Sequence, residues 1–160
     1  MTRLLPLLSA CLLLALSACD DGTVPDSGDP AKVTYAPALG VDLGAMNRNE
    51  AGLYTQDLTV GTGGTEVSVG RYVEVHYTGW LPNGTQFDTS RDGNRPLEIL
   101  QFGIRPRLIA GWEEGLIGMR AGGKRRLVIP STLGYGADGS PPAIPPHSVL
   151  VFDVEIVTAR

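Results

Sequence analysis

Alternation of apolar and polar residues predicts a series of short β-strands from residue 53 onward. Between residues 72 and 81, Val73, Val75 and Tyr77 fall on one face, and Glu74 and His76 fall on the other. This two-residue period is typical of a half-buried strand. The turn sequence Pro-Asn-Gly at 82–84 then predicts a hairpin, because Asn-Gly readily takes positive φ. Further strands are predicted at 53–60, 87–90, 97–100, 125–130 and 149–157.

One stretch has helical spacing instead, from about Pro106 to Leu116. Its apolar residues on one face are Leu108, Ile109, Trp112 and Leu116. Pro106 suits a first turn, whereas Gly111 lowers helix propensity and Gly115 or Gly118 can end the helix. Several antiparallel strands with one short helix predict an α+β fold in which the helix lies on one face of the sheet.

The first 18 residues have the pattern of a secretory signal peptide. Arg3 gives a positive start, residues 4–16 are almost wholly apolar, and Leu-Ser-Ala-Cys follows at 16–19. The apolar stretch is too short for a stable membrane-spanning helix. Residues 16–19 resemble a bacterial lipobox, so we expect Cys19 to be acylated. The alternative is an ordinary signal peptide followed by a chance cysteine.

These features predict four parts of the chain and a location. We expect a lipoprotein-type signal peptide at 1–18, a flexible Gly- and Pro-containing tether at 19–32, an N-terminal extension at 33–51 and a globular domain at 52–160. The composition of 33–51 leaves open whether this extension packs on the domain or stays loose. A lipidated Cys19 would hold the protein on a membrane surface of the cell envelope, facing the periplasm or the exterior.

Composition excludes several classes of function. The formal net charge is -4 and no run of lysine or arginine occurs, so no nucleic-acid partner is expected. Both cysteines lie within the first 19 residues, and the two histidines are far apart in sequence. We therefore expect no disulfide, no metal site and no cofactor in the folded domain. Nor does any long exposed apolar stretch demand a partner, which predicts a monomer.

Two motifs have structural interpretations that outweigh catalytic ones. Residues 118–124 fit a phosphate-loop pattern up to Lys124, but Arg125 stands where Ser or Thr should bind magnesium. We interpret these glycines as a turn. The adjacent Glu113 and Glu114 would point about 100° apart on a helix, so at least one of them is expected to face solvent.

An aromatic set is the most prominent candidate for a site. Its members are Tyr77, Phe87, Trp112, Tyr135 and Phe152. Rings of this number can fill a small core, so the pattern alone does not distinguish a packed core from an open pocket. Asp88, beside Phe87, is the one polar residue that stands out. It is either a functional carboxylate or a carboxylate that caps a turn.

Ordered sequence blocks resemble those of FK506-binding proteins, a family of peptidyl-prolyl cis/trans isomerases. The blocks are Val-His-Tyr-Thr-Gly at 75–79, Phe-Asp-Thr-Ser-Arg at 87–91, Gly-Trp-Glu-Glu-Gly at 111–115, Tyr-Gly at 135–136, Ile-Pro-Pro-His at 144–147 and Leu-Val-Phe-Asp-Val-Glu at 150–155. The resemblance covers about residues 52–160. It implies a twisted antiparallel sheet wrapped around one short helix, and an enzyme that accelerates X–Pro bond rotation.

The resemblance also implies a role for each candidate residue. Trp112 would form the floor of an apolar cleft, Asp88 would lie at its rim, and the Ile109 N–H and Tyr135 hydroxyl would each hold a substrate carbonyl. The expected catalytic residues are Asp88, Trp112 and Tyr135, together with Tyr77, Phe87 and Phe152. The other residues expected to bind substrate are Leu97, Leu108, Ala143 and Ile144.

Several positions depart from the pattern of well-known family members. Gly93 stands where an arginine often pairs with the aspartate, so Asp88 is expected to be free or to find Arg91 or Arg95. Leu97 replaces an aromatic residue, and Ser140 and Ala143 replace larger groups over the cleft. The implied partners are proline-containing polypeptides, a membrane through the lipid, and macrolides like FK506 or rapamycin. The alternative is a non-catalytic module or chaperone that uses the same cleft to bind proline-containing segments.

Overall fold

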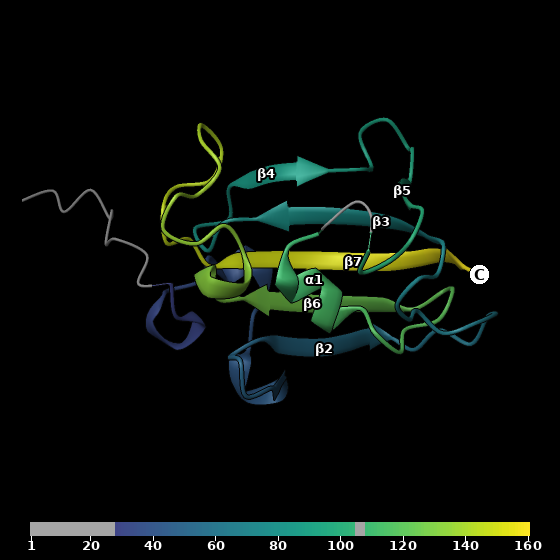
Figure 1. Ribbon diagram of the computed structural model, residues 1–160. Helices are drawn as coiled ribbons and strands as arrows, with labels where there is room; N and C mark the ends of the chain where they lie inside the picture. The colour runs from purple at the N-terminus through teal and green to yellow at the C-terminus, as the bar shows by residue number, and fades with distance from the viewer. Residues whose placement is uncertain (1–27, 105–107) are drawn as a thin grey trace, which may run out of the picture.

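A computed structural model describes residues 28–104 and 108–160 of the chain. Within these residues an antiparallel sheet of seven strands runs in the order β1-β2-β6-β7-β3-β4, and β5 also pairs with β3 (Figure 1). The strands are β1 (Asn47–Arg48), β2 (Tyr54–Thr59), β3 (Val73–Trp80), β4 (Gln86–Thr89), β5 (Leu97–Ile99), β6 (Lys124–Ile129) and β7 (Leu150–Ala159). The helix α1 (Ala110–Gly115) lies against one face, which confirms the predicted fold. Four 3-10 turns, η1 to η4, cover Pro30–Lys32, Pro37–Leu39, Leu43–Ala45 and Ser131–Leu133.

The two longest strands, β3 and β7, form the centre of the sheet. They pair from Val73 and Ala159 at one end to Trp80 and Val151 at the other. The opposite edge of β3 is shared between two short strands: β5 pairs with 73–75, and β4 pairs with 78–80. Tyr77 therefore lies opposite the gap between β4 and β5. All the strands predicted in the described residues are present, with ends shifted by at most two residues.

Two glycines let α1 approach the sheet closely. A Cβ atom on Gly111 would lie 2.5 Å from Cγ2 of Ile129, and one on Gly115 would lie 2.7 Å from a Cδ atom of Leu127. Neither distance is possible for a real side chain, so glycine is required for this contact. Burial of Trp112 against the sheet offsets the low helix propensity of this segment.

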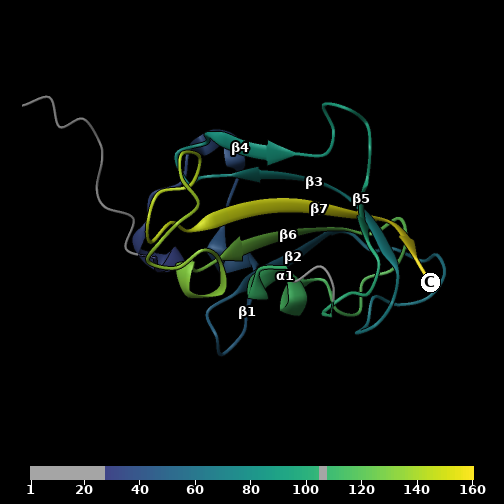
Figure 2. The same ribbon diagram turned by 45° about the horizontal axis from the view of Figure 1, so that its top comes forward.

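The opposite face of the sheet is covered by the N-terminal extension. Alternate residues of β6 and β7 belong to different apolar clusters: Leu127 and Phe152 face α1, whereas Val128 and Val151 pack with Leu39. Because successive side chains of a strand point to opposite faces, the sheet has two buried faces. Figures 1 and 2 show α1 on one side and the segment before β1 on the other. The extension at 33–51 is therefore packed on the domain, which the sequence left open.

Two predicted boundaries require correction. The predicted tether extends to Lys32, but Gly28 and Pro30 are buried, so its last residues, 28–32, pack on the domain. The predicted helix begins at Pro106, whereas α1 begins at Ala110. Ile109 is extended, and the Leu108 N–H donates to the side chain of Glu113 at 3.3 Å, so both residues precede the helical ladder. The signal peptide, Cys19 and Pro106 lie outside the described residues.

Across residues 28–104 and 108–160, no helix has both the length and the apolar character needed to cross a bilayer. The glycine-rich segment 118–124 forms a turn before β6, with positive φ at Gly118 and Gly122. This confirms the interpretation of these glycines as a turn.

Substitution of Gly111 tests the close contact between α1 and the sheet. Alanine is the better helix former by about 1 kcal/mol, yet we expect Gly111→Ala to destabilise the fold by about 1–3 kcal/mol through overpacking against Ile129. Chemical denaturation measures the change. Gly93→Ala is the control, because a Cβ atom there meets nothing within 4 Å. In an Ile129→Ala background the cost of Gly111→Ala should shrink; an equal cost in both backgrounds would contradict the proposed contact.

Candidate active site

Aromatic rings from three strands and the helix meet on the face covered by α1. The Trp112 ring lies edge-on to Tyr77 and to Phe152, with centroid distances of 5.2 and 5.3 Å. Phe87 is edge-on to Phe152 at 5.4 Å. Such edge-to-face contacts are a preferred arrangement of aromatic pairs. Trp112 and Phe152 are each only 4 % exposed, whereas Tyr77 and Phe87 are half-buried, so the group runs from a buried floor to an accessible rim.

The rim carries a hydrogen bond between Tyr77 and Asp88. The Tyr77 hydroxyl donates to Oδ2 of Asp88 at 2.7 Å, and the carboxylate itself is exposed. Burial, and then the hydrogen bond and charge of Asp88, raise the pKa of Tyr77 above its ordinary value. Burial and the charge of Asp88 also raise the pKa of Tyr135. One carboxylate therefore acts on both phenols, and both stay protonated at neutral pH.

The gap between β4 and β5 opens the sheet edge beside Tyr77. In place of a strand partner, the Ser90 hydroxyl accepts from the Tyr77 N–H at 2.9 Å, and the Thr89 hydroxyl donates to the Tyr77 carbonyl at 2.9 Å. An open hollow of about 490 Å³ lies there, lined by Tyr77, Ser90, Arg95, Pro96, Leu97 and Glu98. Of the five predicted aromatic residues, Tyr77 alone lines this hollow.

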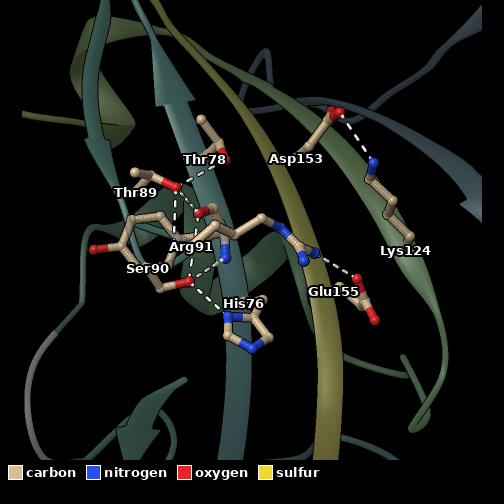
Figure 3. Close-up of polar contacts among 9 residues, drawn as sticks. His76, Thr78, Thr89, Ser90, Arg91, Lys124, Asp153 and Glu155 are labelled. Carbon is tan, nitrogen blue, oxygen red and sulfur yellow. Dashed lines mark hydrogen bonds and ion pairs between the residues drawn. The ribbon is translucent and has the colours of Figure 1, made fainter. Parts of the chain in front are cut away.

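Side-chain hydroxyls hold this edge, and sequence reasoning did not single them out. Besides its bond to Tyr77, Ser90 lies 3.0 Å from Nδ1 of His76, and Thr89 lies 3.0 Å from the Thr78 hydroxyl (Figure 3). In the sequence, Thr89 and Ser90 could have been recognised by their position directly after Asp88. A strand that has lost its partner there needs other hydrogen-bonding groups. The hydroxyls of Thr89 and Ser90 thereby help to position Tyr77 and Asp88.

The loop from Ser131 to His147 supplies Tyr135 and Ile144. Ile144 is 4 % exposed and belongs to the apolar cluster that contains Trp112, whereas Tyr135 is 40 % exposed. Ala143 is exposed and lies outside that cluster. Of the two predicted substrate-binding residues in this loop, the structure therefore brings Ile144 to the rings but not Ala143.

The remaining predicted residues lie around the same floor. Leu97, Leu108 and Ile109 are half-buried and pack against the cluster that contains Trp112. Ile109 immediately precedes α1 and is extended, with φ -61° and ψ 144°. The Trp112 indole Nε1 is buried without a hydrogen-bond partner among the described residues.

Among the described residues Asp88 forms no ion pair with Arg91 or Arg95, which agrees with the alternative that it has no arginine partner. Arg91 instead forms an ion pair with Glu155 on the neighbouring strand β7 (Figure 3), and Asp88 accepts from Tyr77. The adjacent carboxylates on α1 have structural partners: Glu113 accepts from Leu108, and the exposed Glu114 accepts from Asn49 at 2.9 Å. In the described residues, no group of three or more histidine, cysteine or acidic side chains is placed to hold a metal ion.

Comparison with known proteins identifies the family. Residues 63–157 match the model of the FKBP-type peptidyl-prolyl cis-trans isomerases. The chain belongs to this family. It is 51% identical over 106 residues to an FK506-binding protein of Neisseria meningitidis serogroup B, a match that covers 66% of this chain and 94% of that protein. It is 43% identical over 106 residues to the isomerase FKBP1A of Xenopus laevis, covering 66% and 96% of the two chains.

Solved structures agree with this assignment. The crystal structure of FkpA from Escherichia coli superposes with a TM-score of 0.64 and 39% sequence identity, covering 72% of this chain and 52% of that one. The protein is thus a peptidyl-prolyl cis/trans isomerase with the FKBP fold. Residues 28–62 lie outside the match to the family model, although 28–48 pack on the sheet.

The ionisation of Tyr77 tests the geometry of the rim. Asp88→Asn removes the charge but keeps an acceptor oxygen, so we expect the pKa of Tyr77 to fall towards, but not to, the ordinary value of about 10, because burial remains. Ultraviolet absorbance of the phenolate follows the titration, and Tyr77→Phe assigns it. An unchanged titration in Asp88→Asn would contradict the hydrogen bond.

The same shift links stability to pH. The folded protein holds the Tyr77 proton more tightly than the unfolded chain does. The contribution of this proton to the stability of the fold is therefore full below pH about 10, and it is lost as the pH rises towards the higher pKa of the folded state. Tyr77→Phe should therefore lose less stability than the parent over that alkaline range.

Proposed function

We propose that this isomerase accelerates X–Pro bond rotation in exported proteins through the apolar cleft floored by Trp112. The observation that supports this cleft most directly is the edge-on contact of Tyr77 and Phe152 with a tryptophan that is almost fully buried. Phe87 extends this apolar surface through its edge-on contact with Phe152. An apolar surface of this kind would receive an apolar ring, and proline is the residue whose ring an X–Pro substrate would place there.

The reaction needs no acid, base or nucleophile. Rotation about an amide faces a barrier of about 18–20 kcal/mol from the double-bond character of the C–N bond. The planar amide is the more charge-separated state and is well solvated in water. Transfer into an apolar cleft withdraws that solvation, while shape and a few hydrogen bonds favour the twisted form. Each ~1.4 kcal/mol of preferential stabilisation of the twisted amide gives a tenfold rate increase, so a modest difference is sufficient.

Hydrogen-bond donors around the cleft would orient the substrate. The Ile109 N–H, directly before α1, would hold one substrate carbonyl, and the Tyr135 hydroxyl would hold a second. A raised pKa keeps Tyr135 protonated and able to donate across the physiological range. Asp88 would lie beside the twisting amide, with its orientation fixed by Tyr77. In these roles Ile109 and Tyr135 bind the substrate backbone, Trp112 forms the floor, and Tyr77, Phe87 and Phe152 form the walls.

The same cleft would accept macrolides like FK506. Several relatives carry the name FK506-binding protein, and the rings that would contact such a ligand are present here. Leu97, which replaces the aromatic residue of well-known family members and packs against the cluster with Trp112, would alter macrolide affinity and the preference for the residue before proline.

Removal of the floor tests the proposed cleft. In the full chain, purified in mild detergent, we expect Trp112→Leu to lower kcat/KM for a short X–Pro peptide at least tenfold, equivalent to about 1.4 kcal/mol of transition-state stabilisation. Trp80→Leu is the matched control, because Trp80 packs in the cluster on the other face of the sheet. Circular dichroism verifies the fold of both variants. Equal losses in the two variants would contradict a cleft at Trp112.

We further propose that the enzyme is a monomer anchored to a membrane of the cell envelope by acyl chains on Cys19. The support is the basic, apolar and lipobox-like sequence of residues 1–19. A single acyl chain binds membranes marginally, whereas two suffice for stable anchoring. The enzyme would then act on proline-containing segments of proteins that emerge into the same compartment.

Substitution of the cysteine tests this location. Cys19→Ser should abolish labelling by a fatty-acid analogue and move the protein from the membrane fraction to the soluble fraction. Cys11→Ser is the control, because it changes the other lipobox-like cysteine and should leave both readouts unchanged. Membrane retention of Cys19→Ser with labelling intact would show that the anchor lies elsewhere.

A further inference from the structure

The N-terminal segment that precedes β1 meets the base of the loop that carries Tyr135. Gly28 is buried, and its carbonyl accepts from the Ser131 N–H at 3.0 Å. A Cβ atom on Gly28 would lie 2.3 Å from Oγ of Ser131 and 3.4 Å from the His147 carbonyl oxygen. Gly28 thus packs between the first and last residues of the loop 131–147.

Hydrogen bonds continue from Ser131 into this loop. The Ser131 carbonyl accepts from the Gly136 N–H at 2.8 Å, and the Gly136 carbonyl accepts from the His147 N–H at 2.8 Å. Tyr135 lies next to Gly136 in this series. A shift of Ser131 would therefore be passed to the backbone that places the Tyr135 hydroxyl.

The segment is itself fixed to the sheet along its length. The Ala36 N–H donates to the Pro82 carbonyl at 2.8 Å, and Arg126 donates to the Leu39 carbonyl. The Tyr35 hydroxyl donates to the Pro30 carbonyl at 2.8 Å. Leu39 and Met46 are buried against Val128 and Val151. These contacts hold the segment that contains Gly28 on the domain. Gly28 can therefore act as a fixed support for the loop.

We propose that residues 28–46 form a clasp that positions the active-site loop, with Gly28 as a positioning residue for Tyr135 and Ile144. The inference rests on the proposed cleft, in which these two residues contact substrate. The clasp lies outside the region that matches the family model, so it would be a means of tuning activity in addition to the shared isomerase fold.

A pair of glycine substitutions in the same segment tests the clasp. Gly28 and Gly40 both have positive φ, at 71° and 59°, so alanine is strained at both positions. A Cβ atom on Gly28 collides with Ser131, whereas one on Gly40 meets only an Arg126 nitrogen at 3.9 Å. Gly28→Ala and Gly40→Ala therefore share the backbone cost and differ in the contact with the loop.

We expect Gly28→Ala to lower kcat/KM for an X–Pro peptide at least about fivefold relative to Gly40→Ala in the full chain, because small misplacements of positioned groups cost up to about 100-fold. The loss should be smaller once Ser131→Gly removes the collision. Amide hydrogen exchange over residues 131–147 should be faster in Gly28→Ala than in Gly40→Ala, with exchange in β6 and β7 equal.

The two readouts separate this proposal from the proposed function. Equal kcat/KM and equal exchange in Gly28→Ala and Gly40→Ala, with an active parent, would overturn the clasp and leave the cleft intact. If Tyr135→Phe and Trp112→Leu both left a fully active enzyme, the proposed cleft would fail, whereas faster loop exchange in Gly28→Ala would still support Gly28 as the support of the loop.

Discussion

The close contact between a short helix and the sheet is the constraint on which the proposed cleft depends. A helix of six residues has little stability by itself, so α1 exists because its buried face packs on β6. Gly111 and Gly115 permit that contact, since a side chain at either position would overlap Ile129 or Leu127. The contact sets the depth of Trp112 and, with it, the floor on which the rings of Tyr77 and Phe152 rest. Ile109, at the start of the helix, is placed by the same contact.

The sheet edge and the loop complete the site by different means. At the edge, β3 loses its strand partner between β5 and β4, and the hydroxyls of Thr89 and Ser90, together with the Ser90 N–H, take over the hydrogen bonds of Tyr77. At the loop, a segment from the opposite face of the sheet supports Ser131. The rigid sheet is therefore buried on both faces, and the accessible parts of the site lie where strand pairing stops.

Sequence reasoning predicted the fold and named the rings of Tyr77, Phe87, Trp112 and Phe152 that the structure brings together, because both follow from local patterns. The two-residue period located the strands, and the ordered family blocks identified Trp112, Tyr77 and Phe152. It did not predict contacts that join distant segments. The partner of Asp88 was left open, and the spacing of residues did not reveal that Arg91 pairs with Glu155 or that Asp88 accepts from Tyr77. The packing of residues 33–51 was left open and residues 28–32 were expected to belong to a flexible tether. The apolar residues of this segment have no regular period, and they depend on a sheet face that exists only once β6 and β7 pair.

The most direct test of the cleft uses the two tryptophans of the chain, Trp80 and Trp112. In an NMR titration of the full chain with an X–Pro peptide, exchange between the cis and trans peptide signals reports catalysis, and the two indole N–H signals report where the peptide binds. The account predicts that the Trp112 signal shifts over the same peptide concentrations that saturate catalysis, while the Trp80 signal, on the other face, stays in place. Catalysis that leaves Trp112 unperturbed, or that moves Trp80 instead, would contradict it.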